Sequence, residues 1–466
     1  MLMRAFLRTL FFILAFTQTC IPTHIALPNF SGLNPEIIAY FKNIKSPTRA
    51  PKKWTFMVYM AADNDLHYFA WKNIQQMERI GSNNQLNIVL QVNERGKKKP
   101  TQRYLVEKGN TVLIPMEKNS KLNTGDAQTL IDFCSWGITQ YPAEHYCLVL
   151  WNHGTGILDP ILSKNHTATD LFHYNSIHHL MELDRSIPFI EHLMTTVYNN
   201  ADQRGVCFDE TYRAYLDNQK IEQALSTICA TALQGKKFDI IAFDACLMSM
   251  LEVAVQCRPY ASIMIGSQEV ELGAGWNYER ALTPLSTVPL DPIQFARHIV
   301  HAYQETYAPI TNDYTQSAVL LDSVADLERN VHHVAHLLIQ ALNNQHDSSV
   351  KNIIKNCRSR RMCTVFDEPS YIDLYHLYTN LLRYVDQFKF RKQAKRDSLR
   401  HALYTELTEG LRIIERTVIA NVTGKNLMNA RGISIYFPEQ KIFNSYFHTN
   451  FGKKNGWLKF LERYLL

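Results

Sequence analysis

Short apolar runs alternate with amphipathic stretches from residue 54 to residue 268, and this alternation predicts an α/β fold. The runs have the length of single strands, and polar turn residues bound them, which is typical of strands buried on both faces of a parallel sheet. Alternating strands and helices indicate a doubly wound sheet with helices on both faces. The predicted strands include residues 54–60, 86–92, 145–151, 238–243 and 261–268.

Two regions depart from this alternation. Residues 157–204 are rich in histidine and other polar residues, contain two prolines and show no clear strand, so they are interpreted as an insertion. From about residue 290 the pattern is mostly helical. We therefore expect an α/β core over 53–290 and a mostly helical C-terminal region over 291–466 that packs on it.

The N-terminus has the layout of a secretory signal peptide over residues 1–20. Two arginines precede the apolar run 10–16, which is too short to span a membrane and is followed by small polar residues. Residues 21–52, rich in proline and polar residues, read as a linker or pro-segment. The prediction is an exported protein, secreted, periplasmic or on the cell surface. A membrane partner is expected only if Cys20 carries a lipid.

Composition fits a globular protein that acts on something other than nucleic acid. Of the 466 residues, 46% are hydrophobic and 20% charged, which is enough to bury a sizeable core. The formal net charge is only +6 and the basic residues are scattered, so there is no nucleic-acid footprint. The sequence gives no indication of the oligomeric state.

Cys246 and His153 are the candidates for chemistry because each follows the end of a predicted strand. In open α/β sheets ligands bind at the carboxyl ends of strands. The residues after Cys246 suit a helix, and a helix N-terminus lowers a thiol pKa. A nucleophilic thiol also needs an imidazole and backbone N–H groups for the oxyanion. The alternative is that Cys246 is a small core residue, since free cysteine is often buried.

Several motifs occur together over residues 54–438. They are WTFMVYMAADNDL at 54–66, LWNHG at 150–154, FDACLM at 243–248, GSQE at 266–269 with GW at 275–276, YIDL at 371–374 and GISIYFP at 432–438. In this order they resemble the motifs of the clostripain-like cysteine peptidases. A resemblance over most of the chain is more specific than any one motif, and it favours the functional interpretation of Cys246 and His153.

The resemblance implies a caspase-like fold, shared with gingipains, legumains and separases, and a Cys–His dyad with no obligatory third member. Cys246 would be the nucleophile and His153 the general acid and base. The backbone N–H groups of Gly154 and Cys246 would form the oxyanion hole. The implied function is an exported cysteine endopeptidase that cuts protein or peptide substrates through a thioester. The alternative is a catalytically silent binding protein on the same fold.

The resemblance also implies cleavage after arginine or lysine, with acidic residues at the bottom of the P1 pocket. Asp244 matches one acid, although it could instead cap a helix beside Cys246. The second acid of relatives corresponds to Ala274, and Glu269 or Glu271 might replace it. The expected substrate-binding residues are Asp244, Ser267, Gln268, Glu269 and Trp276.

Relatives are often activated by self-cleavage between the histidine and cysteine motifs. The basic residues Lys164, Arg185 and Arg204 lie in or at the end of the 157–204 insertion and are candidate processing sites. This makes the chain a candidate zymogen.

No cofactor is required for this chemistry. His332 and His336 have the spacing of a metal-binding helix face, but no His-Glu-x-x-His motif surrounds them, so no metal ligand is predicted. Some relatives depend on calcium, and Asp63, Asp65 or Asp209 could supply oxygens, so a structural calcium ion stays an option.

Overall fold

The computed structural model describes residues 49–117, 120–158, 171–186, 188–191, 205–288, 290–391 and 396–466. The predicted signal peptide with Cys20, most of the predicted linker, Lys164 and Arg204 lie outside the described residues. No helix in the described ranges combines the length and apolar character needed to cross a membrane.

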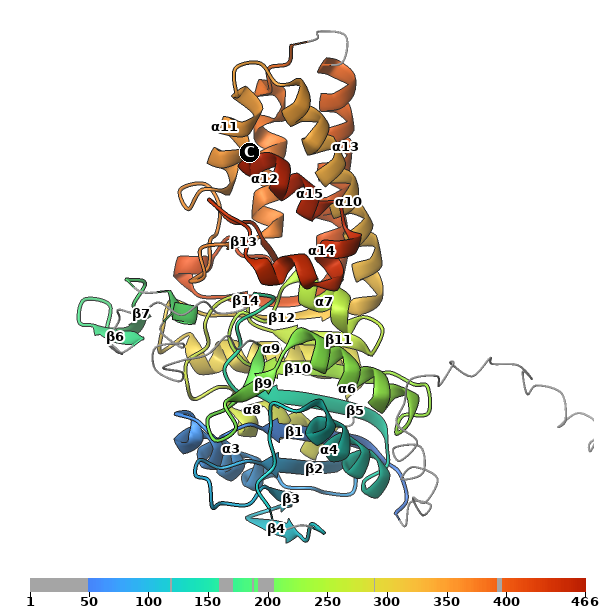
Figure 1. The fold of residues 1–466 in the computed structure, drawn as a ribbon. Helices are drawn as coiled ribbons and strands as arrows, with labels where there is room; N and C mark the ends of the chain where they lie inside the picture. Colours follow the sequence, from blue (N-terminus) through green and yellow to red (C-terminus); the bar gives the residue numbers. More distant parts are fainter. Residues whose placement is uncertain are drawn as a thin grey trace, which may run out of the picture. The chain divides into compact units, whose positions relative to one another are not determined.

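A nine-stranded mixed sheet forms the centre of the described chain, in the order β14-β12-β11-β10-β5-β1-β2-β3-β4 (Figure 1). The inner strands β11, β10, β5, β1 and β2 are parallel, and antiparallel strands flank them on both sides. The strands are β1 (Lys52–Met60), β2 (Leu86–Val92), β3 (Gln102–Glu107), β4 (Asn110–Ile114), β5 (Ala143–Trp151), β10 (Phe238–Asp244), β11 (Ala261–Gly266), β12 (Thr315–Leu320) and β14 (Val418–Thr423). The predicted α/β sheet with flanking helices is therefore confirmed.

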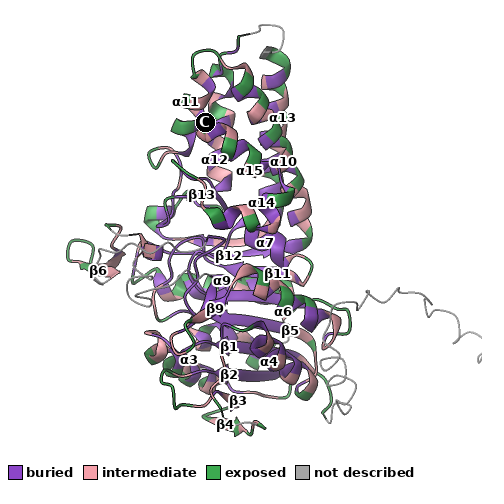
Figure 2. Cartoon of the chain, in the orientation of Figure 1, coloured by how far each residue is buried: buried purple, intermediate pink, exposed green. Residues whose placement is uncertain are grey.

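Alternate residues of the inner strands enter two separate cores, one on each face of the sheet. In β1, Phe56, Val58 and Met60 join one hydrophobic cluster, whereas Met57 and Tyr59 join the other. The strand is buried on both sides (Figure 2), which explains its continuous apolar run. Helices α3 (His67–Ile80), α8 (Tyr278–Leu282) and α9 (Pro292–Tyr307) cover the first face, and α4 (Ala127–Gln140), α6 (Asn218–Ala230) and α7 (Leu251–Cys257) lie on the second.

The C-terminal helices extend the second core. They are α10 (Leu321–Asn344), α11 (Ser349–Arg358), α12 (Leu374–Tyr384), α13 (Arg396–Thr417), α14 (Asn450–Lys454) and α15 (Trp457–Leu465), with the short pair β13 (Tyr371–Asp373) and β15 (Ser434–Tyr436) beneath them. Single turns of 3-10 helix cover Thr283–Ser286, Val385–Gln387, Lys425–Leu427 and Asn444–His448. The predicted boundary at 290 is wrong, because β12 and β14 continue the central sheet beyond it.

The described part of the 157–204 insertion contains a hairpin, β6 (Phe172–Asn175) and β7 (Leu180–Leu183), where no strand was predicted. The Met181 N–H donates to the Ile310 carbonyl at 2.8 Å and ties this hairpin to the region after α9. A second hairpin, β8 (Val206–Asp209) and β9 (Ala214–Leu216), follows. All the described cysteines are buried free thiols.

Candidate active site

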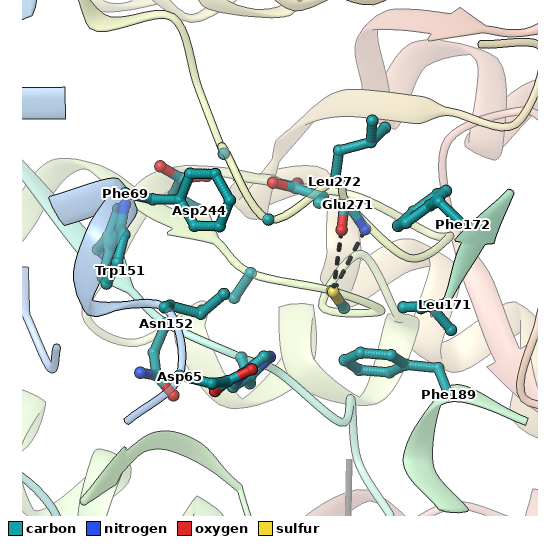
Figure 3. A pocket seen from close by; sticks show the side chains of 16 residues that line it. Asp65, Phe69, Trp151, Asn152, Leu171, Phe172, Phe189, Asp244, Glu271 and Leu272 are labelled. Atoms are coloured by element: carbon teal, nitrogen blue, oxygen red, sulfur yellow. Dashed lines mark hydrogen bonds and ion pairs between the residues drawn. The ribbon is translucent and has the colours of Figure 1, made fainter. Parts of the chain in front are cut away.

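The register of three adjacent parallel strands brings the candidate residues to one edge of the sheet. Asp244, the last residue of β10, is opposite Trp151, the last residue of β5, and Trp151 is opposite Met60, the last residue of β1. His153 and Cys246 each follow two residues later. Both line one pocket of about 360 Å³, which Figure 3 shows from close by. The two residues therefore border the same space.

Cys246 lies on a strained turn rather than at a helix start. Leu247 has a φ of 64°, a conformation that costs free energy in a residue other than glycine and is often found at functional sites. The next helix, α7, begins only at Leu251. The prediction that a helix N-terminus lowers the thiol pKa is therefore wrong. Burial, reinforced by the nearby Glu271 charge, raises the pKa of Cys246 well above its ordinary value.

The backbone of Glu271 covers the thiol. Its N–H donates to Cys246 Sγ at 3.2 Å, and its carbonyl oxygen lies 3.7 Å from the same sulfur (Figure 3). Cys246 is consequently only 5% exposed. A substrate that reaches the sulfur has to displace or bend this short loop, which follows β11.

His153 is held from several sides. The preceding Asn152 accepts a hydrogen bond from the Phe208 N–H at 2.8 Å and donates to the Ala61 carbonyl. The imidazole ring lies near the Phe189 and Phe208 rings, with centroid distances of 6.0 and 6.5 Å. Its Nε2 is 2.8 Å from Asp65 Oδ1. The ring is thus fixed in place at the end of β5.

Gly154 packs directly against the Cys246 turn. A Cβ atom added to Gly154 would lie 2.5 Å from the Cys246 carbonyl oxygen and 3.0 Å from the Ala245 Cβ. Such a contact is too close for any side chain, so only glycine allows the two segments to approach. The two backbones predicted to form an oxyanion hole are therefore neighbours.

Two carboxyl groups form the floor of the pocket. Asp244 accepts hydrogen bonds from the Tyr278 hydroxyl at 2.7 Å and from the Trp276 N–H at 3.1 Å. Glu271 Oε1 accepts one from Gln316 Nε2 at 3.1 Å, and its Oε2 is buried without a hydrogen-bond partner. Two buried acids that line one pocket repel each other when both are ionised.

Burial raises the pKa values of both floor acids. Burial raises the pKa of Asp244 to about 6, against the hydrogen bonds from Tyr278 and Trp276. Burial and the Asp244 charge raise the pKa of Glu271 well above its ordinary value. A second negative charge on the pair is therefore less favourable than the first.

Glu271 was named in the sequence only as a substitute for a missing acid, and the structure places it in the pocket. Asp244 lines the same pocket. It does not cap α7, which starts seven residues later. It packs instead against Gly275, where a Cβ would lie 2.6 Å from Asp244 Oδ1.

The other predicted substrate-binding residues are buried beside the pocket, and their polar groups are used elsewhere. Ser267 hydrogen-bonds Thr315, and Gln268 bonds Asp373 and the Gly432 N–H. Trp276 contributes its backbone N–H to Asp244. None of these side chains lines the pocket. This placement indicates that these side chains support the loop after β11 and do not contact the substrate directly.

Glu269 is engaged by Arg185, one of the predicted processing residues. Arg185 Nη2 lies 2.9 Å from Glu269 and 3.2 Å from Asp313, and both carboxylates are almost fully buried. This charge cluster ties the insertion to the loop after β11. Cleavage after Arg185 would require breaking both ion pairs. The apolar residues Leu171, Phe172 and Phe189 of the same insertion line the pocket wall.

Asp65 is the second pocket residue that the sequence reasoning missed as part of the chemistry. It lies in the segment that follows β1, where it was considered only as a calcium ligand.

In the described residues no group of three or more His, Cys, Asp or Glu side chains could hold a metal ion. On α10, both ring nitrogens of His332 have hydrogen-bond partners. Its Nδ1 accepts the Gly456 N–H at 3.0 Å, so its Nε2 carries the proton and donates to His336.

Comparison with known proteins identifies the family of this chain. A family model described as the clostripain family matches residues 58–181 and 189–464. Clostripain from Hathewaya histolytica is 24% identical over 262 residues, which cover 51% of this chain and 43% of clostripain. The chain thus spans less than half the length of that relative.

Solved structures show the same fold. A secreted C11 cysteine protease from Bacteroides thetaiotaomicron, in complex with an irreversible peptide inhibitor, matches with a TM-score of 0.55 and 18% identity, covering 88% of this chain and 99% of its own. An inactive zymogen C11 protease from Parabacteroides distasonis matches with a TM-score of 0.54 and 18% identity, covering 87% and 98%. Since the family model covers most of the sequence, the chain belongs to the clostripain family of cysteine peptidases.

Proposed function

We propose that this protein is an exported cysteine endopeptidase that uses Cys246 as nucleophile and His153 as general acid and base. The observation that carries the proposal is the convergence of both side chains on one pocket from the ends of adjacent parallel strands. Family membership supports the same chemistry. Cys246 lines a pocket of about 360 Å³, and the cover on its sulfur is the backbone of one short loop.

The reaction follows from the groups in place. Because the resting thiol is neutral, His153 has to accept the Cys246 proton as sulfur attacks the scissile carbonyl. The oxyanion would be met by the N–H groups of Gly154 and Cys246. When the C–N bond breaks, the imidazolium gives its proton to the leaving amine. Water then attacks the thioester, His153 takes a proton from it, and the thiol is restored.

The floor of the pocket supports a basic P1 residue. Asp244 and Glu271 both line the pocket and supply the acidic groups that a cationic side chain would meet there. The aromatic and aliphatic side chains of Phe69, Trp151 and Leu272 line the same pocket and can contact the methylene groups of arginine or lysine. Glu271 thus supplies the second acid in place of a residue at Ala274.

Peptides that differ only at P1 provide the test. We expect hydrolysis after arginine and lysine, and at least a hundredfold lower kcat/KM for citrulline, which has the shape of arginine without its charge. The protein is first incubated until its band pattern is constant. Cys246→Ala and His153→Ala should each abolish turnover. Equal hydrolysis of arginine and citrulline substrates would refute the basic pocket, and activity in Cys246→Ala would refute the nucleophile.

The proposal extends to self-processing between the two motifs. Lys164 and Arg204 have the side chains that the pocket would accept, and Arg185 is held in ion pairs. If incubated wild-type and Cys246→Ala proteins give the same bands, self-processing is excluded. Export is proposed from the N-terminal sequence pattern, and the relative from Bacteroides thetaiotaomicron is itself described as secreted. Mass spectrometry of the mature N-terminus tests it.

A further inference from the structure

In a Cys–His dyad, one imidazole nitrogen serves the thiol and the other has no defined partner. In this protein an acidic side chain lies beside one of the two ring nitrogens of His153. Asp65 Oδ1 is 2.8 Å from His153 Nε2. The two residues come from adjacent strands, because β1 and β5 pair in parallel up to Met60 and Trp151. Asp65, His153 and Cys246 therefore follow the ends of three neighbouring strands, β1, β5 and β10, and all three line the pocket.

The loop that carries Asp65 is fixed by its neighbour. Asn64 is fully buried and donates to the carbonyl oxygens of Ala61 and Phe208 at 2.9 and 2.8 Å. Its Oδ1 accepts the Leu66 N–H at 3.0 Å. Asn64 thus pins the backbone on both sides of Asp65, and a pinned backbone limits the positions that the carboxylate can take.

The imidazole is equally constrained, so the contact is directional. The His153 side chain is 9% exposed, and its ring lies near two phenylalanine rings, Phe189 and Phe208. A carboxylate only accepts hydrogen bonds, so His153 Nε2 must be the protonated nitrogen of the neutral ring. The lone pair of the neutral ring is then on Nδ1, and in the proposed mechanism this nitrogen takes the thiol proton.

Asp65 is suited to stay ionised during the reaction. The charge of His153 and its hydrogen bond lower the pKa of Asp65, against the effect of burial. The side chain is 40% exposed, so water also solvates the carboxylate. It can stabilise the imidazolium without taking its proton, which is the role of the carboxylate in a Ser-His-Asp triad.

We propose that Asp65 is a positioning residue that selects the reactive tautomer of His153 and stabilises its protonated form. The inference rests on the proposed roles of Cys246 and His153. The thiol proton moves from Sγ to Nδ1 and then to the leaving amine, while the Nε2–H bond to Asp65 stays intact. In the second half, Nδ1 takes a proton from water and returns it to sulfur. Asp65 neither gains nor loses a proton.

Three variants test this role on the full chain with an arginine P1 peptide. Asp65→Ala should lower kcat about 10- to 100-fold and leave KM within twofold, because Asp65 acts on the imidazole and not on the P1 floor. Asp65→Asn can accept the Nε2–H but has no charge, so its kcat should lie between those of Asp65→Ala and the wild type. Glu210→Gln is the matched control. It removes a nearby carboxylate that pairs with Arg95 at 3.0 Å, and should keep wild-type kcat.

Chemical rescue separates positioning from folding. Because the Asp65 side chain is partly exposed, the space left in Asp65→Ala should admit formate, and sodium formate should restore kcat in a saturable way that sodium chloride does not reproduce. Wild-type kcat in Asp65→Ala, or a loss with raised KM and no formate rescue, overturns the inference. Full activity in His153→Ala would instead overturn the proposed function and the inference with it.

Discussion

The two buried acids of the pocket floor should act as one negative charge, so that removing either acid matters much less than removing both. We predict that the two acids share one proton near neutral pH, because burial raises the pKa of both and the charge of Asp244 raises that of Glu271 further. In Glu271→Gln the remaining Asp244 loses its like-charged neighbour and ionises fully. The net charge that a P1 cation meets is then unchanged.

The expected loss of kcat/KM follows from the number of negative charges that the P1 cation meets. A cation about 4 Å from one carboxylate gains about 4 kcal/mol at an effective dielectric constant of 20. We therefore expect Glu271→Gln to lower kcat/KM for an arginine substrate less than about tenfold, and Asp244→Asn/Glu271→Gln to lower it several hundredfold, at about 1.4 kcal/mol per tenfold. Glu271→Gln is the cleaner single variant, because a glutamine oxygen can still accept from Gln316 and the backbone cover on the thiol is kept.

The assay compares kcat/KM for matched arginine and citrulline peptides, since a ratio cancels changes in the Cys–His chemistry. Burial raises the pKa of Asp244 to about 6, so the acid is neutral below that pH. The arginine-to-citrulline ratio should therefore fall as pH drops through about 6 in the wild type. Thermal unfolding of each variant controls for folding. If Glu271→Gln alone loses as much as the double variant, or the double variant keeps its preference for arginine, the shared-charge reasoning is refuted.

Three further predictions concern the fold and the site. Burial raises the pKa of Glu252 to about 7, so the folded state binds a proton that the unfolded state has released, and stability is lost as pH rises from about 4 through 7. In urea denaturation, Glu252→Gln should therefore raise the free energy of unfolding by about 3 kcal/mol at pH 8 and little at pH 4, and equal effects at both pH values would contradict this. Gly154→Ala should lower kcat at least a hundredfold in the peptide assay, because its Cβ would lie 2.5 Å from the Cys246 carbonyl oxygen; wild-type turnover would show that this close approach is unnecessary. Arg185→Ala should lower the free energy of unfolding by about 3 kcal/mol, because two buried carboxylates lose their partner. Arg280→Ala, which breaks an exposed ion pair, should lower it by under about 1 kcal/mol, and equal losses would argue against a stabilising role of the Arg185 ion pairs.

The strand ends could be predicted from the sequence because they depend on local pattern. The apolar runs before His153 and Cys246 match β5 and β10, and parallel strands end at a common edge. Asp244 was named instead from the resemblance to the clostripain-like peptidases. What the pattern could not show was how the next residues turn. Leu247 adopts a positive φ that its side chain does not favour, so the helix expected there begins later.

Glu271 and Asp65 could not be assigned because their roles depend on contacts between distant segments. Glu271 reaches Cys246 only because the loop after β11 folds back over the β10 turn. Its neighbour Glu269 is just as acidic in the sequence, but it points to Arg185. The boundary placed at 290 failed for a similar reason, since β12 and β14 are short strands between long helices and join the sheet only through tertiary pairing.

Covalent labelling tests the central pairing of thiol and imidazole most directly. A peptide chloromethylketone with lysine at P1 should alkylate Cys246 through displacement of chloride by Sγ, and digestion with mass spectrometry should find the adduct on that cysteine alone. His153→Ala should slow the labelling at least a hundredfold, and an arginine peptide substrate should protect against it. Adducts spread over other cysteines, or a labelling rate in His153→Ala equal to that of the wild type, would contradict a catalytic dyad at these two strand ends.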